Sequence, residues 1–229
     1  YRVQANAQTI TMPSSPNSPR LVKGGIVLLD PESSAVLRVI PLQYNPDTLT
    51  RTLQAQTVGE GADPSEAMRL KGPPVETIKL EAELDATDAM EFPDQNANVV
   101  EYGIQPQLAA LETILYPSSA QLQQNNSLAS SGTLEIIPTE SPLVLFVWSK
   151  TRIVPVRLTE FSVTEEAFDV NLNPLRAKVS LGMRVLSIND LGFNHKGGSL
   201  YMIYQQQKEM LASLNKSGTL GALGIGGIP

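Results

Sequence analysis

Few side chains in this sequence have the types and the spacing that catalysis requires. The chain has one histidine, His195, in the turn-rich segment GFNHKGG, where it could act as a general base but where a solvated loop histidine is the usual case. Two pairs of carboxylates, Glu81 with Glu83 and Glu165 with Glu166, could serve a glycosidase, whose two acids flank the bond that is cleaved. The first pair has the spacing of one exposed strand face, and the single tryptophan indicates no sugar-binding cleft. We therefore expect no catalytic residue and no enzymatic activity.

The sequence also predicts no metal or cofactor site. Cysteine is absent, which excludes disulfides, thiol catalysis, zinc ribbons and iron–sulfur clusters, and one histidine cannot form a multi-histidine metal centre. The glycines of GALGIGG at 221–227 are followed by no strand–helix unit and no Lys-Ser/Thr pair, so they do not form a phosphate-binding loop. Asp85 and Asp88 lack the spacing and the glycine of an EF-hand.

Length and composition indicate a β-rich protein with many turns. The 229 residues are enough for one large domain or two small ones, and 16 glycines and 17 prolines accompany a low charged fraction of 17%. The net charge of −6 argues against nucleic-acid binding, and no apolar run approaches the roughly 20 residues that a membrane-inserted helix needs. Because residues 1–23 contain no apolar signal segment, we expect assembly in the cytoplasm, and the final location is not assigned.

The charges are distributed unevenly along the chain. Residues 76–140 contain eleven acids and a single base, Lys79, whereas residues 1–29 contain three bases and no acid. This polarity would let copies stack with acidic surface against basic surface, although a solvated acidic face is the simpler interpretation.

Strands dominate the predicted elements, which follow a flexible arm at residues 1–23. The clearest pattern is at 75–85, where apolar and charged residues alternate and predict a strand with one buried and one exposed face. Later strands are expected at 143–148, 152–158, 160–169 and 177–185, joined by turns and therefore antiparallel.

Two helices are predicted among these strands. Pro106 stands at the first position of an amphipathic helix of about three turns, and Ser199 can cap a final helix. Residues 86–104 and 118–132 are expected to be irregular. The sequence therefore predicts a mainly β, antiparallel barrel or sandwich at 24–215, with one mid-sequence amphipathic helix and one C-terminal helix, followed by a Gly/Leu-rich tail or linker at 216–229.

Four segments in this order resemble a known family. They are LQYNPDTL at 42–49, IKLEAELDAT at 78–87, PLVLFVW at 142–148 and NPLRAKV at 173–179. Together with the helix between them, they resemble the N-terminal, tail-tube-like domain of the LysM-containing tube-adaptor or tube-initiator baseplate proteins of contractile injection systems, over about residues 22–215. Relatives often carry a LysM-like module after this domain, so no role of that module is carried over to the Gly/Leu-rich segment.

The resemblance implies a structural role in a phage-tail-like particle. Such proteins form a homo-hexameric ring that joins a spike or hub to the inner tube inside a baseplate, and their fold is similar to a tail-tube β-barrel whose six subunits line a lumen. The implied partners are therefore further copies of the chain, the spike or hub protein, inner-tube proteins and other baseplate subunits.

Two surface hypotheses combine the resemblance with the charges. Glu81, Glu83 and Asp85 would face the lumen, where like charge would keep cargo from sticking. The loop at 59–74 and the arm at 1–23 would make contacts between rings or subunits, and the charged residues of that loop are Glu60, Asp63, Glu66, Arg69 and Lys71. An alternative function is a carbohydrate- or cell-wall-binding β domain, which would need exposed aromatic clusters from only twelve aromatic residues.

Overall fold

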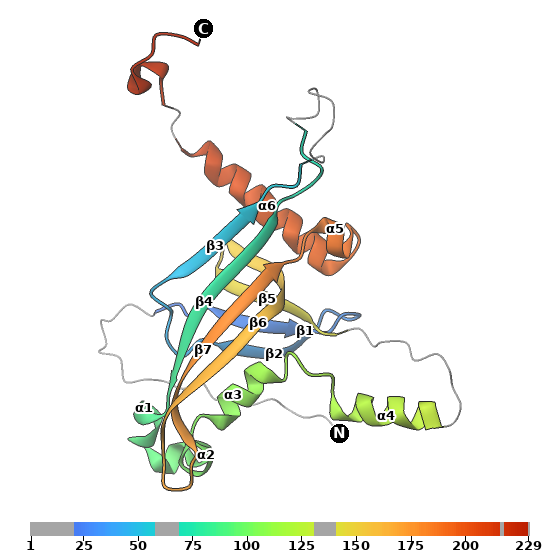
Figure 1. Cartoon of the computed structure of the whole chain (residues 1–229), viewed down its shortest axis with the longest axis vertical. Coiled ribbons are helices and arrows are strands. Elements are labelled where there is room, and N and C mark those ends of the chain that lie inside the picture. Colours follow the sequence, from blue (N-terminus) through green and yellow to red (C-terminus); the bar gives the residue numbers. More distant parts are fainter. Residues whose placement is uncertain (1–20, 58–68, 131–140, 216–217, 229) are drawn as a thin grey trace.

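Seven antiparallel strands form one sheet in the computed structural model, which describes residues 21–57, 69–130, 141–215 and 218–228 (Figure 1). The strands are β1 (Gly25–Leu29), β2 (Val36–Pro41), β3 (Leu49–Gln54), β4 (Val75–Asp85), β5 (Leu143–Ser149), β6 (Arg152–Phe168) and β7 (Pro174–Val185). Their order across the sheet is β2-β1-β5-β6-β7-β4-β3. The mainly β, antiparallel prediction is confirmed. The two outer strands, β2 and β3, do not pair with each other, so one copy forms an open sheet and not a closed barrel.

Strand β6 is one continuous strand of 17 residues where the sequence predicted two. Its pairing with β7 shifts between Leu158, opposite Met183, and Glu160, opposite Gly182, so Thr159 is the extra residue of a β-bulge. A Cβ atom at Gly182 would lie only 2.7 Å from the Cβ of Glu160, and glycine therefore permits this close approach. The extra residue shifts the alternation of inward and outward side chains in β6 by one position. The sequence pattern is therefore interrupted at the bulge, and the two halves of β6 look like separate strands.

The predicted alternation along β4 is confirmed. Ile78, Leu80, Ala82 and Leu84 are buried. They join a core with the inward residues of β5, β6 and β7, among which Val154, Val179 and Met183 are completely buried. The ring of Trp148 stacks on Phe146 at the edge of this core.

The two predicted helices are both present. The mid-sequence helix is α3 (Gln105–Glu112), which is shorter than expected and buries Leu108 and Leu111. The C-terminal helix is α6 (Lys196–Ser213), and it begins before the predicted cap at Ser199. His195 caps it, because its Nδ1 atom accepts a hydrogen bond of 3.0 Å from the backbone N–H of Gly197.

The predictions of irregular structure at 86–104 and 118–132 were wrong. The first segment contains α1 (Thr87–Met90), η2 (Pro93–Gln95) and α2 (Ala97–Tyr102), and the second contains α4 (Ser119–Ser130). None of these helices buries a residue, so they have no apolar periodicity that the sequence could reveal. The remaining short helices are α5 (Ile188–Leu191) and η3 (Leu220–Leu223). The boundaries 1–23, 24–215 and 216–229 stay predictions, and residues 1–20 lie outside the described part.

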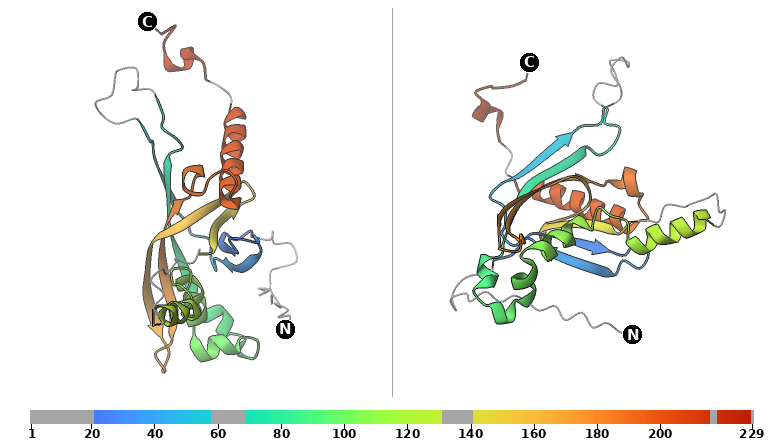
Figure 2. Two further views of the ribbon diagram at one scale, coloured as in Figure 1. Left: turned by 90° about the vertical axis from the view of Figure 1, so that its right-hand side faces the viewer. Right: turned by 60° about the horizontal axis from the view of Figure 1, so that its bottom comes forward.

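Helices α1, α2, α3, α5 and α6 lie on one side of the section formed by β3, β4, β7 and β6, whereas α4 extends away from the sheet (Figure 1). Figure 2 shows α5 and α6 near one end of these strands and α1, α2 and α3 near the other, while the opposite face carries no helix. This bare face is the one to which Glu81 and Glu83 belong.

Candidate assembly surface

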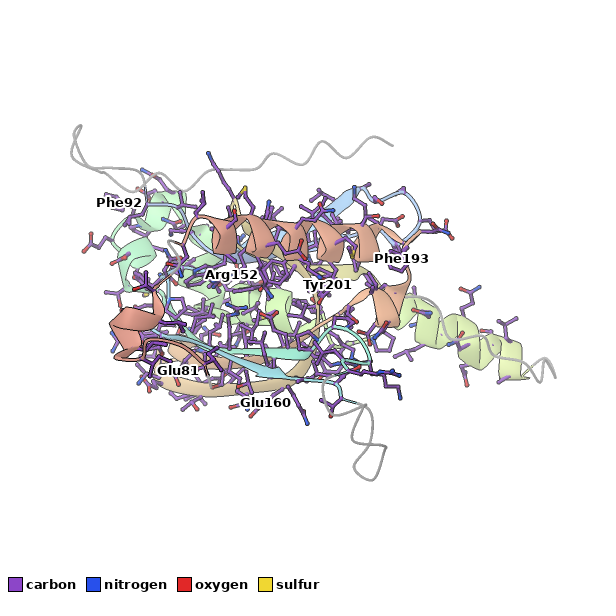
Figure 3. All side chains as sticks on the ribbon, turned by 90° about the horizontal axis from the view of Figure 1, so that it is seen from above. Glu81, Phe92, Arg152, Glu160, Phe193 and Tyr201 are labelled. Atoms are coloured by element: carbon purple, nitrogen blue, oxygen red, sulfur yellow. The ribbon has the colours of Figure 1, made fainter. Side chains whose placement is uncertain are left out.

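The bare face of the sheet is polar and contains the side chains that the sequence placed in a lumen. Glu81 and Glu83 are exposed there, and Asp85 is half-buried at the end of β4. Burial tends to raise the pKa of the Asp85 carboxyl, but hydrogen bonds from Thr87 and Arg176 outweigh it and lower that pKa. Figure 3 shows Glu81 and Glu160 on the side of the sheet away from α6. Whether this face lines a lumen stays a prediction.

The acids of β4 share this face with bases from neighbouring strands. Strand β7 places Lys178 opposite Glu83 and Arg176 opposite Asp85. Ion pairs join Lys79 to Glu160 at 2.7 Å, Arg176 to Asp85 at 2.8 Å and Lys178 to Glu166 at 3.5 Å. By strand register the face carries five bases (Lys79, Arg157, Arg176, Lys178, Arg184) and five acids (Glu81, Glu83, Asp85, Glu160, Glu166). Arg184 is paired with Asp190 of α5 at 2.7 Å, so four bases remain to offset the five acids, and the like charge expected from β4 alone is largely offset.

The section β3-β4-β7-β6 has an open strand edge on each side, where backbone groups have no strand partner among the described residues. On one side, β3 is the outer strand of the sheet. On the other, β5 pairs with β6 only as far as Val156, so residues 157–168 of β6 have no strand partner on that side among the described residues. Open strand edges present free N–H and C=O groups and are templates for pairing with another chain.

The predicted contact loop is described only at its C-terminal end. Arg69 and Lys71 are exposed there, and neither makes an ion pair with another described residue. The N–H of Lys71 donates to the carbonyl of Gln56, which closes the β3–β4 end. Glu60, Asp63 and Glu66 lie outside the described residues, so the contact role of this loop stays a prediction.

A buried ionic cluster joins α6 to β3 and β4, and it was not predicted from the sequence. Glu76 is only 2% exposed, and its carboxylate accepts hydrogen bonds from Arg51 at 2.8 Å, Tyr204 at 2.9 Å and Lys208 at 2.9 Å. Burial would raise the pKa of Glu76, but the three donors together hold it below its ordinary value. Burial and the nearby carboxylate raise the pKa of the Tyr204 hydroxyl. The alternation of β4 already placed Glu76 on the apolar face, which was the available signal.

Two of the residues weighed as catalytic candidates make structural contacts in the described part of the chain. His195 is a helix cap, and Glu166 pairs with Lys178. No group of three or more histidine, aspartate or glutamate side chains within the described ranges could hold a metal ion. Two aromatic ring pairs, Phe146 with Trp148 and Tyr201 with Tyr204, pack in or against the core and do not form an exposed sugar platform. Among the helices of the described part, none is both long and apolar enough to span a membrane.

Comparisons with known proteins give only distant similarity. No known family matches the sequence, and no curated protein matches it. Among solved structures, the chain is similar to a chain from the tail of an empty gene transfer agent particle with C6 symmetry, at 12% identity and a TM-score of 0.26. It is also similar to a chain from the virion of a native gene transfer agent particle, at 12% identity and a TM-score of 0.25. Each match covers 71% of this chain and 90% of the other. Similarity at this level does not establish a shared fold or function.

Proposed function

We propose that this protein is a structural component of a contractile, phage-tail-like particle and forms a hexameric adaptor ring between the spike or hub and the inner tube. The observation that carries the proposal is the polar, four-stranded section β3-β4-β7-β6, which ends in an open edge on each side. The type of particle, the number of copies and the partner proteins in this proposal are taken from the sequence resemblance to tube adaptors. Assembly in the cytoplasm is part of the same proposal.

Strand direction favours pairing between copies through these edges. Neighbouring strands alternate in direction across the section, so β3 and β6 run in opposite directions. When β3 of one copy lies beside the open edge of β6 in the next, the two are antiparallel. Because each copy contributes an even number of strands, the pattern continues without a break around a closed ring.

The side chains on the two edges suggest a register. Thr50, Thr52 and Gln54 point to the polar face of β3. A register with Thr52 opposite Ser162 places Thr50 opposite Thr164 and Gln54 opposite Glu160, all on the polar face of β6. Hydroxyl and amide pairs of this kind stabilise antiparallel strands. In such a ring the helices pack on the opposite face, so the bare face with Glu81 and Glu83 can line the channel.

Paired cysteines test this arrangement directly, because the chain has no cysteine of its own. Thr52→Cys combined with Ser162→Cys is expected to give a ladder of cross-linked copies on oxidation, because the two Cβ atoms face each other across the strands. Thr52→Cys combined with Arg157→Cys is the control out of register and is expected to give no ladder. No cross-linking of the first pair, with wild-type protein monomeric in sedimentation, would contradict the proposal.

A further inference from the structure

An apolar groove opens where β5 ends beside β6. It has a volume of about 370 Å³ and is lined mainly by aliphatic side chains, including Ile114, Leu115, Leu143, Val144, Leu158 and Leu191. Leu115 is exposed although it faces the groove. The groove thus exposes apolar surface that another element could cover.

The groove lies at the start of the open edge of β6. Val144 lines the groove, and it is the β5 residue at which the pairing with β6 ends. Arg157 and Leu158, the first residues of β6 beyond that pairing, also line it. An extra strand added along residues 157–168 would therefore end at the groove. Edge-strand recognition commonly combines backbone pairing with a pocket for a side chain of the added strand.

The β3–β4 end carries apolar side chains suited to such a pocket. Leu53 on β3 is 50% exposed, and Leu70, which pairs with Thr57 in an isolated bridge, is 72% exposed. With Thr52 opposite Ser162, the chain beyond Gln54 continues toward Arg157. The register therefore brings Thr57, and Leu70 beside it, to the groove of the neighbouring copy.

The charge that lines the groove is opposite to the net charge of the sequence between Thr57 and Leu70. Arg157 lines the groove, no carboxylate is among its described lining residues, and Arg157 makes no ion pair with a described residue. The sequence that joins Thr57 to Leu70 contains the three carboxylates Glu60, Asp63 and Glu66 against the single base Arg69. Opposite charges at the rim of a contact favour correct docking.

We propose that this groove is a socket for a second copy of the chain, which inserts Leu70 at the β3–β4 end of the neighbouring subunit. The socket fixes the ends of the paired strands and prevents the register from slipping along the open edge of β6. This inference rests on the ring proposed above and adds the side-chain contact that fixes the register between neighbouring copies.

The experiment compares two double-cysteine variants of the full chain under the same oxidation. Leu70→Cys combined with Leu115→Cys reports on the socket, and the Thr52→Cys/Ser162→Cys variant reports on the ring. We expect both to give cross-linked ladders. Leu70→Cys combined with Val170→Cys is the matched control, because Val170 is 98% exposed at the far end of the β6–β7 hairpin, and it is expected to give no ladder.

A charge variant gives a second readout that does not depend on thiol geometry. Leu70→Asp is expected to abolish oligomers in sedimentation while leaving the monomer folded, as judged by circular dichroism, because Leu70 is exposed in one copy. Val170→Asp should leave both the oligomers and the fold unchanged. A ladder from Thr52→Cys/Ser162→Cys, with none from Leu70→Cys/Leu115→Cys and intact oligomers of Leu70→Asp, overturns the socket and leaves the ring. Absence of both ladders overturns the socket, and it overturns the ring as well when the wild-type protein is monomeric in sedimentation.

Discussion

Replacing Glu76 by glutamine tests how α6 is attached to the sheet. The carboxylate of Glu76 is buried and accepts hydrogen bonds from Arg51, Tyr204 and Lys208 at 2.8–2.9 Å. A glutamine of the same shape retains one acceptor oxygen, so two charge-assisted hydrogen bonds lose their anionic partner. Such bonds contribute about 1.5–3 kcal/mol each. Because Arg51 and Lys208 remain partly exposed and can be hydrated, we expect Glu76→Gln to lower the free energy of unfolding by about 3 kcal/mol.

Urea unfolding followed by the fluorescence of Trp148 measures this loss, since the single tryptophan stacks on Phe146 at the core. Glu83→Gln is the matched control on the exposed face of the same strand, where Glu83 makes no ion pair with a described residue, and should change stability by less than about 0.5 kcal/mol. Equal stability of Glu76→Gln and wild-type protein would show that the hydrogen bonds of the Glu76 carboxylate do not stabilise the attachment of α6.

The same comparison has a defined pH dependence. The pKa of Glu76 is lowered in the folded protein, so its carboxylate stabilises the fold at pH values above its ordinary pKa of 4.5. This contribution is lost as the pH falls from that value through the lower folded pKa. The difference between wild-type protein and Glu76→Gln should therefore be full at pH 7 and shrink below about pH 4.5. A difference that stays constant across this range would show that charge is not its source.

Two further predictions concern backbone geometry. Leu172, in the β6–β7 turn, has a φ of 63°, so Leu172→Gly should raise the free energy of unfolding by about 0.5 kcal/mol, whereas Val170→Gly should not raise it. A Cβ atom at Gly198 would lie 1.8 Å from the carbonyl oxygen of Gly192, so Gly198→Ala should lower stability by about 2–3 kcal/mol in the same urea assay. Gly221→Ala is its control, with only Thr219 nearby, and an unchanged Gly198→Ala protein would contradict the close packing of α6.

Local patterns predicted the elements whose faces differ in polarity. The alternation at 75–85 gave β4 its buried and exposed faces correctly, and the hairpin before Ala177 was correctly taken as antiparallel. The helix α4 escaped prediction because none of its side chains is buried, so its polar sequence has no periodic apolar stripe. Hydrophobic periodicity arises where one face of an element is buried, so an element without a buried face cannot be predicted from it.

The properties of the candidate surface depend on contacts that are distant in sequence. The charge of the polar face could not be obtained from β4 alone, because Arg176 and Lys178 reach Glu83 and Asp85 only through the pairing of β4 with β7. The open edge of β6 likewise depends on where β5 stops pairing. Glu76 was within reach of the sequence, since its position in the alternation places an acid among buried residues.

Native mass spectrometry of the purified wild-type chain of 229 residues distinguishes a closed ring of six copies from a monomer and from open assemblies. We expect a dominant species with six times the 24.7 kDa mass of one copy, and the loss of that species in Leu70→Asp. A protein that remains monomeric over the whole concentration range, or one that forms assemblies of unlimited size, would contradict a closed ring of six copies.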